Sequence, residues 1–284
     1  MRARPECSAV ECAVARPAPF CPRCRGTGFA IEERDGIEVA VRCSCRRAAA
    51  PEALVEAARI PPRYAHCSIE GFEVWSGDHG SRNLQVQAKR RTREFVDCYP
   101  GVERGLLFMG SVGTGKTHLA VAALAELAAT KAVRGLYVNA VQLVQDLQLS
   151  FESGGPSREG ILAPVTDTEL LVLDELGAGR LTDWVRDLLY YVINARYMAQ
   201  RVTIFTTNYV DSAWAPGEHT SYPGAVAPDG AVASPRPSPA AYSETLTDRI
   251  TERLRSRLHE MADVIELLGE DYRARRVGRG GRRP

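Results

Sequence analysis

The sequence has no long hydrophobic run and almost no net charge. No stretch of about 18 apolar residues occurs along the chain, so no segment is long enough to cross a bilayer as a helix. The first residues, Met-Arg-Ala-Arg-Pro, do not lead into the apolar core of a secretory signal peptide. The sequence therefore predicts a cytoplasmic protein that does not bind membranes. The formal net charge of +1 provides no general basic field, so any nucleic-acid binding must come from a local patch.

Cysteine is rare over most of the chain but clustered near its start. Cytoplasmic proteins seldom keep disulfides, so a cysteine cluster there indicates a metal site. Two closely spaced pairs are present, and a tight turn in each pair can bring both sulfurs to one ion. Four thiolates suit tetrahedral Zn²⁺. The predicted zinc ligands are Cys21, Cys24, Cys43 and Cys45.

The segment between the two cysteine pairs has the pattern of a β-hairpin. Residues 29–33 and 37–41 are predicted strands, and the Asp-Gly pair between them is a typical hairpin turn. The hairpin would return the second cysteine pair to the first. The alternatives are four unrelated free cysteines, or a metal site that includes Cys7 or Cys12. The arginines around the cluster indicate either a partner-binding face or an ordinary solvated surface.

A glycine-rich stretch, Gly110-Ser-Val-Gly-Thr-Gly-Lys-Thr117, is the strongest motif of the chain. It follows a predicted buried strand at 104–109 and precedes a predicted helix at 118–129, which is the context of a nucleoside triphosphate site. The loop N–H groups and the helix N-terminus would bind phosphate, Lys116 would neutralise phosphate charge, and Thr117 would bind Mg²⁺. The alternative is a glycine-rich turn that matches by chance. The predicted nucleotide-binding residues of this segment are Gly110, Gly113, Thr114, Gly115, Lys116, Thr117 and His118.

A second motif supplies acidic residues at a strand end. Residues 169–175 are a continuous apolar run that closes with Asp174 and Glu175, the pattern of a buried parallel strand whose carboxyl end faces a ligand. Asp174 would hold Mg²⁺ and Glu175 would polarise the attacking water. A further predicted strand at 201–208 ends in Asn208, which is placed to orient water near the γ-phosphate. A strand that merely ends in acids is the alternative, but the glycine-rich loop argues against it.

The remaining chain divides into recognisable segments. A basic run within 83–99 is more typical of a solvated helix face than of a DNA contact. Helices are also predicted at 46–59, 140–151, 184–198 and 246–261, and strands at 135–139 and 264–267. The predicted domains are a flexible leader at 1–20, a zinc module at 21–47, a linker helix and turn at 48–68, a nucleotide-binding α/β domain at 69–275 with a disordered insertion at 212–243, and a basic tail at 276–284.

The motifs together resemble one group of ATPases. The glycine-rich loop, Leu171-Val-Leu-Asp-Glu-Leu-Gly177, Phe205-Thr-Thr-Asn-Tyr209 and Arg253-Leu-Arg-Ser-Arg-Leu258 resemble AAA+ ATPases of the DnaC/DnaI helicase-loader type, and are similar to the IstB transposition ATPases. The resemblance covers roughly residues 60 to 275. It implies a P-loop AAA+ three-layer sandwich with a parallel sheet and no C-terminal helical lid. Glu175 departs from the second Asp common in these loaders.

The resemblance also implies roles for individual residues. Asn208 corresponds to sensor 1, and Arg257 to the arginine finger that enters the site of a neighbouring subunit. Arg253 is a weaker candidate for the finger, and Arg257 could instead form a structural ion pair with a core acid. Arg273 corresponds to the sensor 2 arginine. The site would then be shared between self-associated subunits.

Three functions are consistent with these features. The first is an ATP-dependent loader that binds Mg²⁺, single-stranded DNA and, through its zinc module, a replicative DNA helicase. The second is a transposition helper ATPase that binds duplex DNA and a transposase. The third is a non-enzymatic zinc adaptor, which the intact Lys116, Asp174, Glu175 and Asn208 argue against. The zinc module favours the loader, because a transposition helper typically carries no metal there.

Overall fold

The computed structural model describes residues 29–34, 37–42, 51–75, 79–152, 157–211 and 244–274, with only the backbone of the first two ranges. The predicted hairpin is confirmed: β1 (Phe29–Arg34) pairs antiparallel with β2 (Ile37–Arg42). The predicted zinc ligands Cys21, Cys24, Cys43 and Cys45, the leader, the 212–243 insertion and the basic tail lie outside the described residues. Within the described ranges no group of His, Cys, Asp and Glu could hold a metal ion by itself. No helix of those ranges is long and apolar enough to span a membrane.

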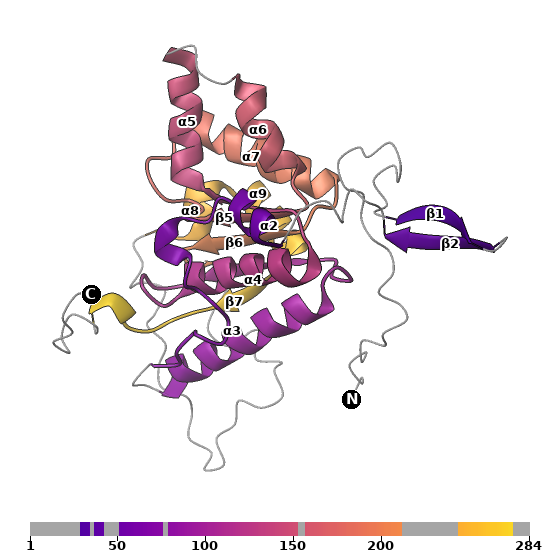
Figure 1. Cartoon of the computed structure of the whole chain (residues 1–284). Helices are drawn as coiled ribbons and strands as arrows, with labels where there is room; N and C mark the ends of the chain where they lie inside the picture. The colour runs from indigo at the N-terminus through magenta and orange to yellow at the C-terminus, as the bar shows by residue number, and fades with distance from the viewer. Residues whose placement is uncertain are drawn as a thin grey trace.

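Five parallel strands form the central sheet, which confirms the predicted α/β fold (Figure 1). Each strand is five residues long, the three inner strands are buried throughout, and helices connect successive strands, as in a sheet covered on both faces. The strand that precedes the glycine-rich loop lies second from one edge. In spatial order the strands are β4 (Gly135–Asn139), β5 (Leu170–Asp174), β6 (Thr203–Thr207), β3 (Gly105–Met109) and β7 (Ala262–Glu266).

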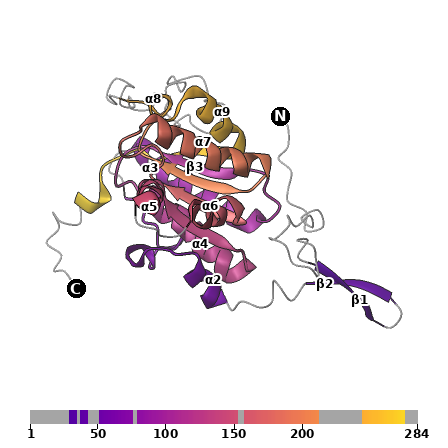
Figure 2. The same cartoon turned by 90° about the horizontal axis from the view of Figure 1, so that it is seen from above.

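Alternate strand residues build two cores, one on each face of the sheet. Phe108 and Ile204 belong to the first core, whereas their neighbours Leu107 and Phe205 belong to the second. Figure 2 shows α2 and α4 on one side of the sheet and α7, α8 and α9 on the other. The three-layer arrangement predicted from the sequence is therefore confirmed.

Helices cover the sheet in two layers, one packed against each core. The first contains α2 (Pro51–Ala57), the short 3₁₀ helix η1 (Pro62–Tyr64), α3 (His79–Cys98) and α4 (Lys116–Lys131). The second contains α5 (Ala140–Glu152), α6 (Arg158–Asp167), α7 (Asp183–Met198), α8 (Leu246–Ile250) and α9 (Glu252–Met261). In Figure 1, α5 and α6 rise side by side from the end of the sheet.

Helix α6 was not predicted. Gly160 and Pro164 interrupt the sequence pattern, and both residues are unfavourable in a helix interior. The Ser157 side chain nevertheless accepts a hydrogen bond from the Gly160 backbone N–H and begins the helix. Leu162 and Val165 are buried, so packing against the second core offsets the weak local preference.

The single helix predicted at 246–261 is two helices. Thr251 adopts a positive φ of 74°, which ends α8 and starts α9 in a new direction. A capping box between Thr245 and Asp248 fixes the beginning of α8. The break allows Leu246 of α8 and Leu254 of α9 to reach the same core. The final strand begins at Ala262 rather than at residue 264.

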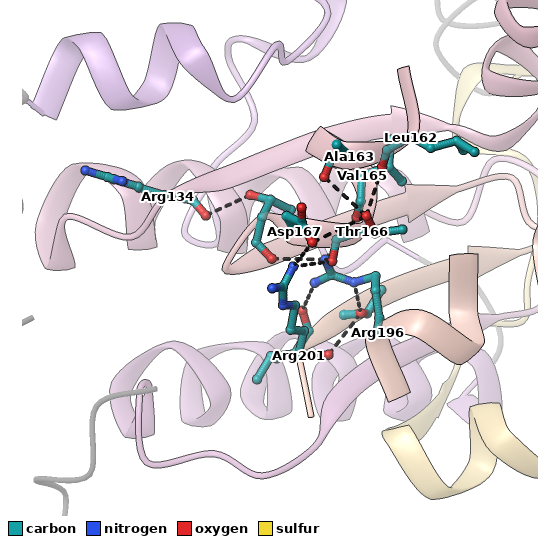
Figure 3. Close-up of polar contacts among 11 residues, drawn as sticks. Arg134, Leu162, Ala163, Val165, Thr166, Asp167, Arg196 and Arg201 are labelled. Atoms are coloured by element: carbon teal, nitrogen blue, oxygen red, sulfur yellow. Dashed lines mark hydrogen bonds and ion pairs between the residues drawn. The ribbon is translucent and has the colours of Figure 1, made fainter. Parts of the chain in front are cut away.

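One buried cation joins α6, α7 and β6. Arg196 of α7 is fully buried and donates five hydrogen bonds of 2.8–3.2 Å (Figure 3). Burial first, and then the charge of Arg201, lowers the pKa of Arg196 to about 9. Helix C-terminal carbonyls carry partial negative charge, which favours a cation here without a carboxylate partner. The acceptors are Thr203 Oγ1 and the carbonyl oxygens of Val165, Thr166, Thr168 and Val202.

Basic side chains of α3 form hydrogen bonds and ion pairs within the molecule. Lys89 Nζ donates to the carbonyl oxygens of Glu70 (2.8 Å) and Phe72 (3.0 Å). Arg91 pairs with Asp263 at 3.2 Å. These contacts hold the segment before α3 and the strand β7 against the helix, so the run is structural rather than an open nucleic-acid surface.

Candidate nucleotide site

The glycine-rich loop is shaped by left-handed backbone angles. Gly110 and Gly113 have φ values of 134° and 76°, which side-chain-bearing residues rarely adopt. The C-terminal segment also leaves no room for larger residues. A Cβ atom on Gly110 would lie 2.1 Å from the Leu267 carbonyl oxygen, and one on Gly113 would lie 1.9 Å from Asp271 Oδ1. The Tyr272 N–H donates to the Gly113 carbonyl (3.2 Å), so residues over 150 positions apart complete the loop together.

Lys116, the first residue of α4, is buried inside the loop. Its Nζ donates to the carbonyl oxygens of Gly110 (3.0 Å) and Ser111 (2.6 Å). Burial first lowers the pKa of Lys116 to about 8, Asp174 opposes this effect, and Arg273 adds to it. Phosphate oxygens at this position would favour the charged amine. The geometry therefore fits the predicted role of Lys116 in binding the phosphates of a nucleotide.

Asp174 joins the two sequence motifs. Its carboxylate is almost fully buried, and Oδ1 accepts hydrogen bonds from Thr117 Oγ1 (2.9 Å) and Thr206 Oγ1 (2.5 Å). Mg²⁺ prefers hard oxygen ligands and keeps several water ligands of its own. The hydroxyl of Thr117 and the carboxylate of Asp174 supply such oxygens beside the phosphate loop, so the donor set fits Mg²⁺.

Tyr137 also contacts Asp174, and sequence reasoning missed it. Its hydroxyl donates to Asp174 Oδ2 at 2.6 Å, and burial, followed by the nearby carboxylate, raises the pKa of this phenol. Its ring lies 6.4 Å from that of Tyr64, and its backbone N–H donates to Ala58. The segment that follows α2 is therefore in contact with Tyr137, the residue whose hydroxyl binds the Asp174 carboxylate. A tyrosine facing inward on the strand next to β5 was the only available signal.

Glu175 follows β5 in a left-handed conformation with φ 58°. Its carboxylate is exposed and accepts a hydrogen bond from Asn139 Nδ2 at 3.0 Å. Asn139 ends the neighbouring strand β4, in register with Asp174, and its Oδ1 also caps the start of α5. Asn139 was not predicted as a site residue, although its place at the end of a strand beside β5 could have indicated it. The contact holds the Glu175 carboxylate toward the sheet edge.

Asn208 lies at the same edge of the sheet. It follows β6, which lies between β5 and β3, and it is half-buried. Carboxyl ends of neighbouring parallel strands meet at one edge, so Asn208 lies between the strand ends that carry Asp174 and the phosphate loop. The fold thus brings together the residues predicted from the two motifs.

The residues predicted from the two motifs lie within a segment that matches a protein-family profile. The sequence profile described as "IstB-like ATP binding protein" matches residues 45–217, which is more than half of the chain. The chain belongs to the IstB-like ATP-binding protein family. Within the region matched are the glycine-rich loop, Asp174, Glu175 and Asn208.

Individual relatives of this IstB-like chain include helicase loaders. The replicative helicase loader DnaC of Escherichia coli K12 is 28% identical over 152 residues, which are 52% of this chain and 58% of DnaC. The replicative helicase loader DnaI of Bacillus subtilis 168 is 34% identical over 119 residues, 41% of this chain and 37% of DnaI. The phage-like element PBSX protein XkdC of the same strain is 27% identical over 196 residues, 66% of this chain and 71% of XkdC. The chain therefore spans about half the length of the curated loaders it matches.

Solved structures agree with the sheet described above. The crystal structure of the DnaC helicase loader matches with a TM-score of 0.56 and 30% identity, covering 73% of this chain and 99% of that chain. The crystal structure of DnaI matches with a TM-score of 0.50 and 24% identity, which supports the fold alone. The fold is that of the P-loop AAA+ domain of DnaC. The family match and the DnaC fold together support ATP binding by this IstB-like chain.

The sensor 2 candidate of this IstB-like chain lies near the phosphate loop. Arg273 belongs to a helical turn at 272–274, and its Nε lies 3.9 Å from Asp271. The side chain is largely exposed, yet its charge acts on the pKa of Lys116. Between β7 and residue 274 the described chain contains this single helical turn.

The finger candidate Arg257 stacks on aromatic rings of its own subunit. Its guanidinium lies 4.6 Å from the Tyr190 ring centroid and 5.5 Å from that of Tyr197. Its Nη1 is buried and has no hydrogen-bond partner among the described residues. The structural alternative, an ion pair with a core acid, is thus replaced by cation–π contacts with α7. Arg253, the weaker candidate, is exposed at the start of α9.

His118 contacts the linker segment in this structure. Its Nε2 lies 2.8 Å from the Ser68 carbonyl oxygen, and its ring meets Phe72 edge-on at 5.6 Å. Burial lowers its pKa more than the Ser68 hydrogen bond raises it. His118 thus anchors the segment before α3 on the first turn of the nucleotide-binding helix.

A groove of about 1090 Å³ opens beside the acidic residues. It lies between η1, the edge strand β4 and the α5–α6 pair, and reaches Asp174 and Glu175 at its inner end. Its lining combines apolar residues with basic, aromatic and amide side chains. These include Arg59, Arg63, Tyr64, Gln142 and Gln145.

Proposed function

We propose that this chain is an ATP-hydrolysing loader of a replicative DNA helicase. The observation that carries the proposal is the contact of Thr117 with Asp174, which joins the phosphate loop to the acidic strand end and leaves Glu175 beside them. Relatives that are named replicative helicase loaders support the choice of process.

The residues divide the chemistry of hydrolysis among them. Lys116 would bind the β- and γ-phosphates, and Thr117 with Asp174 would hold an Mg²⁺ that neutralises phosphate charge. Glu175 polarises the attacking water once its carboxylate leaves the amide of Asn139. Asn208 orients that water.

We further propose that the site is completed by a second copy of the chain. The arginine finger Arg257 would leave Tyr190 and Tyr197 and enter the neighbouring site, where it offsets negative charge in the transition state. Head-to-tail assembly follows, because the finger helix and the phosphate loop lie in different parts of one subunit. Arg273 would contact the same phosphates from within its own subunit.

Single-stranded DNA is the proposed polymer ligand. The groove beside η1 offers the guanidinium groups of Arg59 and Arg63 for phosphates and the ring of Tyr64 for base stacking. Amide side chains on α5 add hydrogen-bonding groups without imposing one base sequence. Arg59 and Arg63 supply the local basic groups, and the groove also contains the carboxylates of Asp146, Asp174 and Glu175.

The helicase would bind through the N-terminal module. The hairpin β1–β2 supports the predicted zinc module, in which Cys21, Cys24, Cys43 and Cys45 would bind one Zn²⁺. Elemental analysis of the purified chain and of a Cys43→Ser/Cys45→Ser variant checks this ligand set, since the variant should lose the metal.

A loading assay tests the function as a whole. The wild-type chain with ATP should transfer a replicative helicase onto circular single-stranded DNA. The Lys116→Ala variant should not bind ATP and should not promote transfer. Equal transfer by both proteins would rule out an ATP-driven loader. The control is a chain with Arg90→Ala, because Arg90 pairs only with exposed Glu94 at 3.7 Å in the described structure and lies on α3.

Transposition is the second candidate, and the family match is the observation that favours it. A transposition helper would bind duplex DNA and a transposase in place of single-stranded DNA and a helicase. Competition between single-stranded and duplex oligonucleotides of equal length separates the two proposals. Preference for duplex in the presence of ATP would support the transposition helper.

A further inference from the structure

The loop that follows Glu175 has an unusual backbone. Glu175, Gly177 and Gly179 all adopt left-handed angles, with φ values of 58°, 82° and 75°. The Ala178 N–H donates to the Glu175 carbonyl (3.0 Å), and the Leu176 N–H donates to Thr206 of β6 (2.8 Å). A loop of this shape has carbonyl oxygens that need an external donor.

Arg249 of α8 supplies that donor. Its Nε donates to the Gly177 carbonyl oxygen at 2.9 Å, and its Nη2 donates to the Gly179 carbonyl oxygen. Its Nη1 pairs with Glu244 at 2.9 Å, and only 17% of the side chain is exposed. One planar guanidinium therefore bridges both ends of the loop.

The same arginine touches the segment that carries Asn208. Its guanidinium lies 5.1 Å from the Tyr209 ring, and the Leu246 N–H at the start of α8 donates to the Val210 carbonyl (2.8 Å). Two residues further on, the buried carboxylate of Asp211 pairs with Arg255 and His259 of α9. Helices α8 and α9 thus hold the segments after β5 and after β6 at once.

We propose that Arg249 is a positioning residue for ATP hydrolysis. It fixes the 177–179 loop, and through that loop the backbone of Glu175, while its ring contact fixes the residue after Asn208. Helix α9 follows α8 directly after the break at Thr251. The same contacts therefore connect the proposed water-orienting residues of a subunit to its own finger candidate, Arg257. This inference rests on the proposed ATPase function.

The chemistry of arginine suits this role in a way that lysine does not. A guanidinium directs several N–H groups in one plane and can bridge two carbonyl oxygens, whereas an ammonium is a point donor. Arg249→Lys therefore keeps the charge near Glu244 and loses the bridge between the two ends of the loop. Neither end of the bridge touches the phosphate loop, so nucleotide affinity should be independent of it.

The test measures binding and turnover separately. With Arg249→Lys in the full-length chain, kcat should fall by about 10²-fold, the size expected when a catalytic group is misplaced by about 1 Å. The Kd for a fluorescent ATP analogue should stay within about threefold of wild type, because a change of that size is smaller than the typical net contribution of one hydrogen bond. Arg186→Lys is the matched control. Arg186 donates to the Arg249 backbone carbonyl at 3.5 Å and pairs with Asp183, but touches neither catalytic segment, so kcat should not change.

Two results would overturn the inference. One is a wild-type kcat for Arg249→Lys, and the other is a loss of kcat matched by an equal loss of ATP affinity. If Arg249→Lys does not fold, as judged by its thermal transition, Glu244→Ala replaces it, because this variant frees only Nη1. It should lower kcat several-fold at constant Kd, and an unchanged kcat would equally overturn the inference. A wild-type chain that binds ATP without turnover overturns the proposed function itself, which is visible before any variant is made.

Discussion

The phosphate-binding half of the site and its hydrolysis half are built differently. Lys116, Thr117 and Asp174 lie at the start of α4 and the end of β5, and their side chains contact the loop or one another directly. Glu175 is exposed, and Arg257 stacks on its own α7 rather than at the site. Nucleotide binding therefore depends on local geometry within one subunit. In the mechanism proposed above, hydrolysis depends on contacts of Glu175 and Arg257 that must change, and on a second subunit.

The largest effect should come from the finger. Arg257→Ala should lower turnover by about 10³–10⁵-fold, the range seen for arginine fingers, because the transition-state charge loses its counter-ion. Mixing this variant with Lys116→Ala should restore part of the ATPase activity, since some interfaces then pair an intact loop with an intact finger. Arg253→Ala tests the weaker finger candidate and should leave turnover near wild type. Ser256→Ala is the neutral control, because this exposed serine precedes Arg257 on α9. Near wild-type turnover by Arg257→Ala alone at saturating single-stranded DNA would refute the shared site.

The second effect separates the two halves within one subunit. Glu175→Gln should reduce hydrolysis by about 10²–10⁴-fold, the usual contribution of a general base, while ATP still binds. Lys116→Ala should do the opposite and remove binding. Isothermal titration with ATP and a phosphate-release assay measure the two properties. Loss of ATP affinity in Glu175→Gln would place Glu175 in the binding half.

The third prediction uses pH to probe the binding half. Burial lowers the pKa of Lys116 to about 8, and a bound triphosphate favours the charged amine, so binding takes up a proton above that pH. Affinity for ATP should be level from pH 7 to 8 and then fall by up to about tenfold per pH unit. Lys116→Arg should remove this dependence, since arginine stays charged throughout. A level wild-type profile up to pH 9.5 would contradict a buried, phosphate-binding lysine.

The smallest effect should come from removing the hydrogen bond that Asn139 Nδ2 donates to the Glu175 carboxylate. Removing the Asn139 amide should raise basal turnover about fivefold, the equivalent of a net hydrogen bond of about 1 kcal/mol. Asn139→Asp is the sharper variant, because it keeps the acceptor that caps α5 at Val141 while repelling Glu175. Turnover without DNA is the quantity to measure, with thermal unfolding as the folding control. Reduced turnover in Asn139→Asp would show that Asn139 assists Glu175 instead of restraining it.

Local sequence patterns predicted the parts of this protein that depend on neighbouring residues. The phosphate loop, the acidic strand end and all five sheet strands follow from local patterns of glycine, apolar and acidic residues. The zinc ligand set stays a prediction, because its cysteines lie outside the described residues. The place of Asn208 at a strand end indicated its role, whereas the roles of Arg257 and Arg273 came from family resemblance.

Tertiary structure alone decided which distant residues meet. Tyr137 reaches Asp174 across 37 positions, Asn139 reaches Glu175 across 36, and Arg249 reaches Gly177 across 72. No local pattern encodes such pairs, because they depend on strand order and on the direction that α8 takes after β6. The same holds for α6, whose glycine and proline oppose a helix until burial of Leu162 and Val165 favours one. Local chemistry thus specifies the glycine-rich loop and the acidic strand end, and the packing of distant segments specifies which side chains surround them.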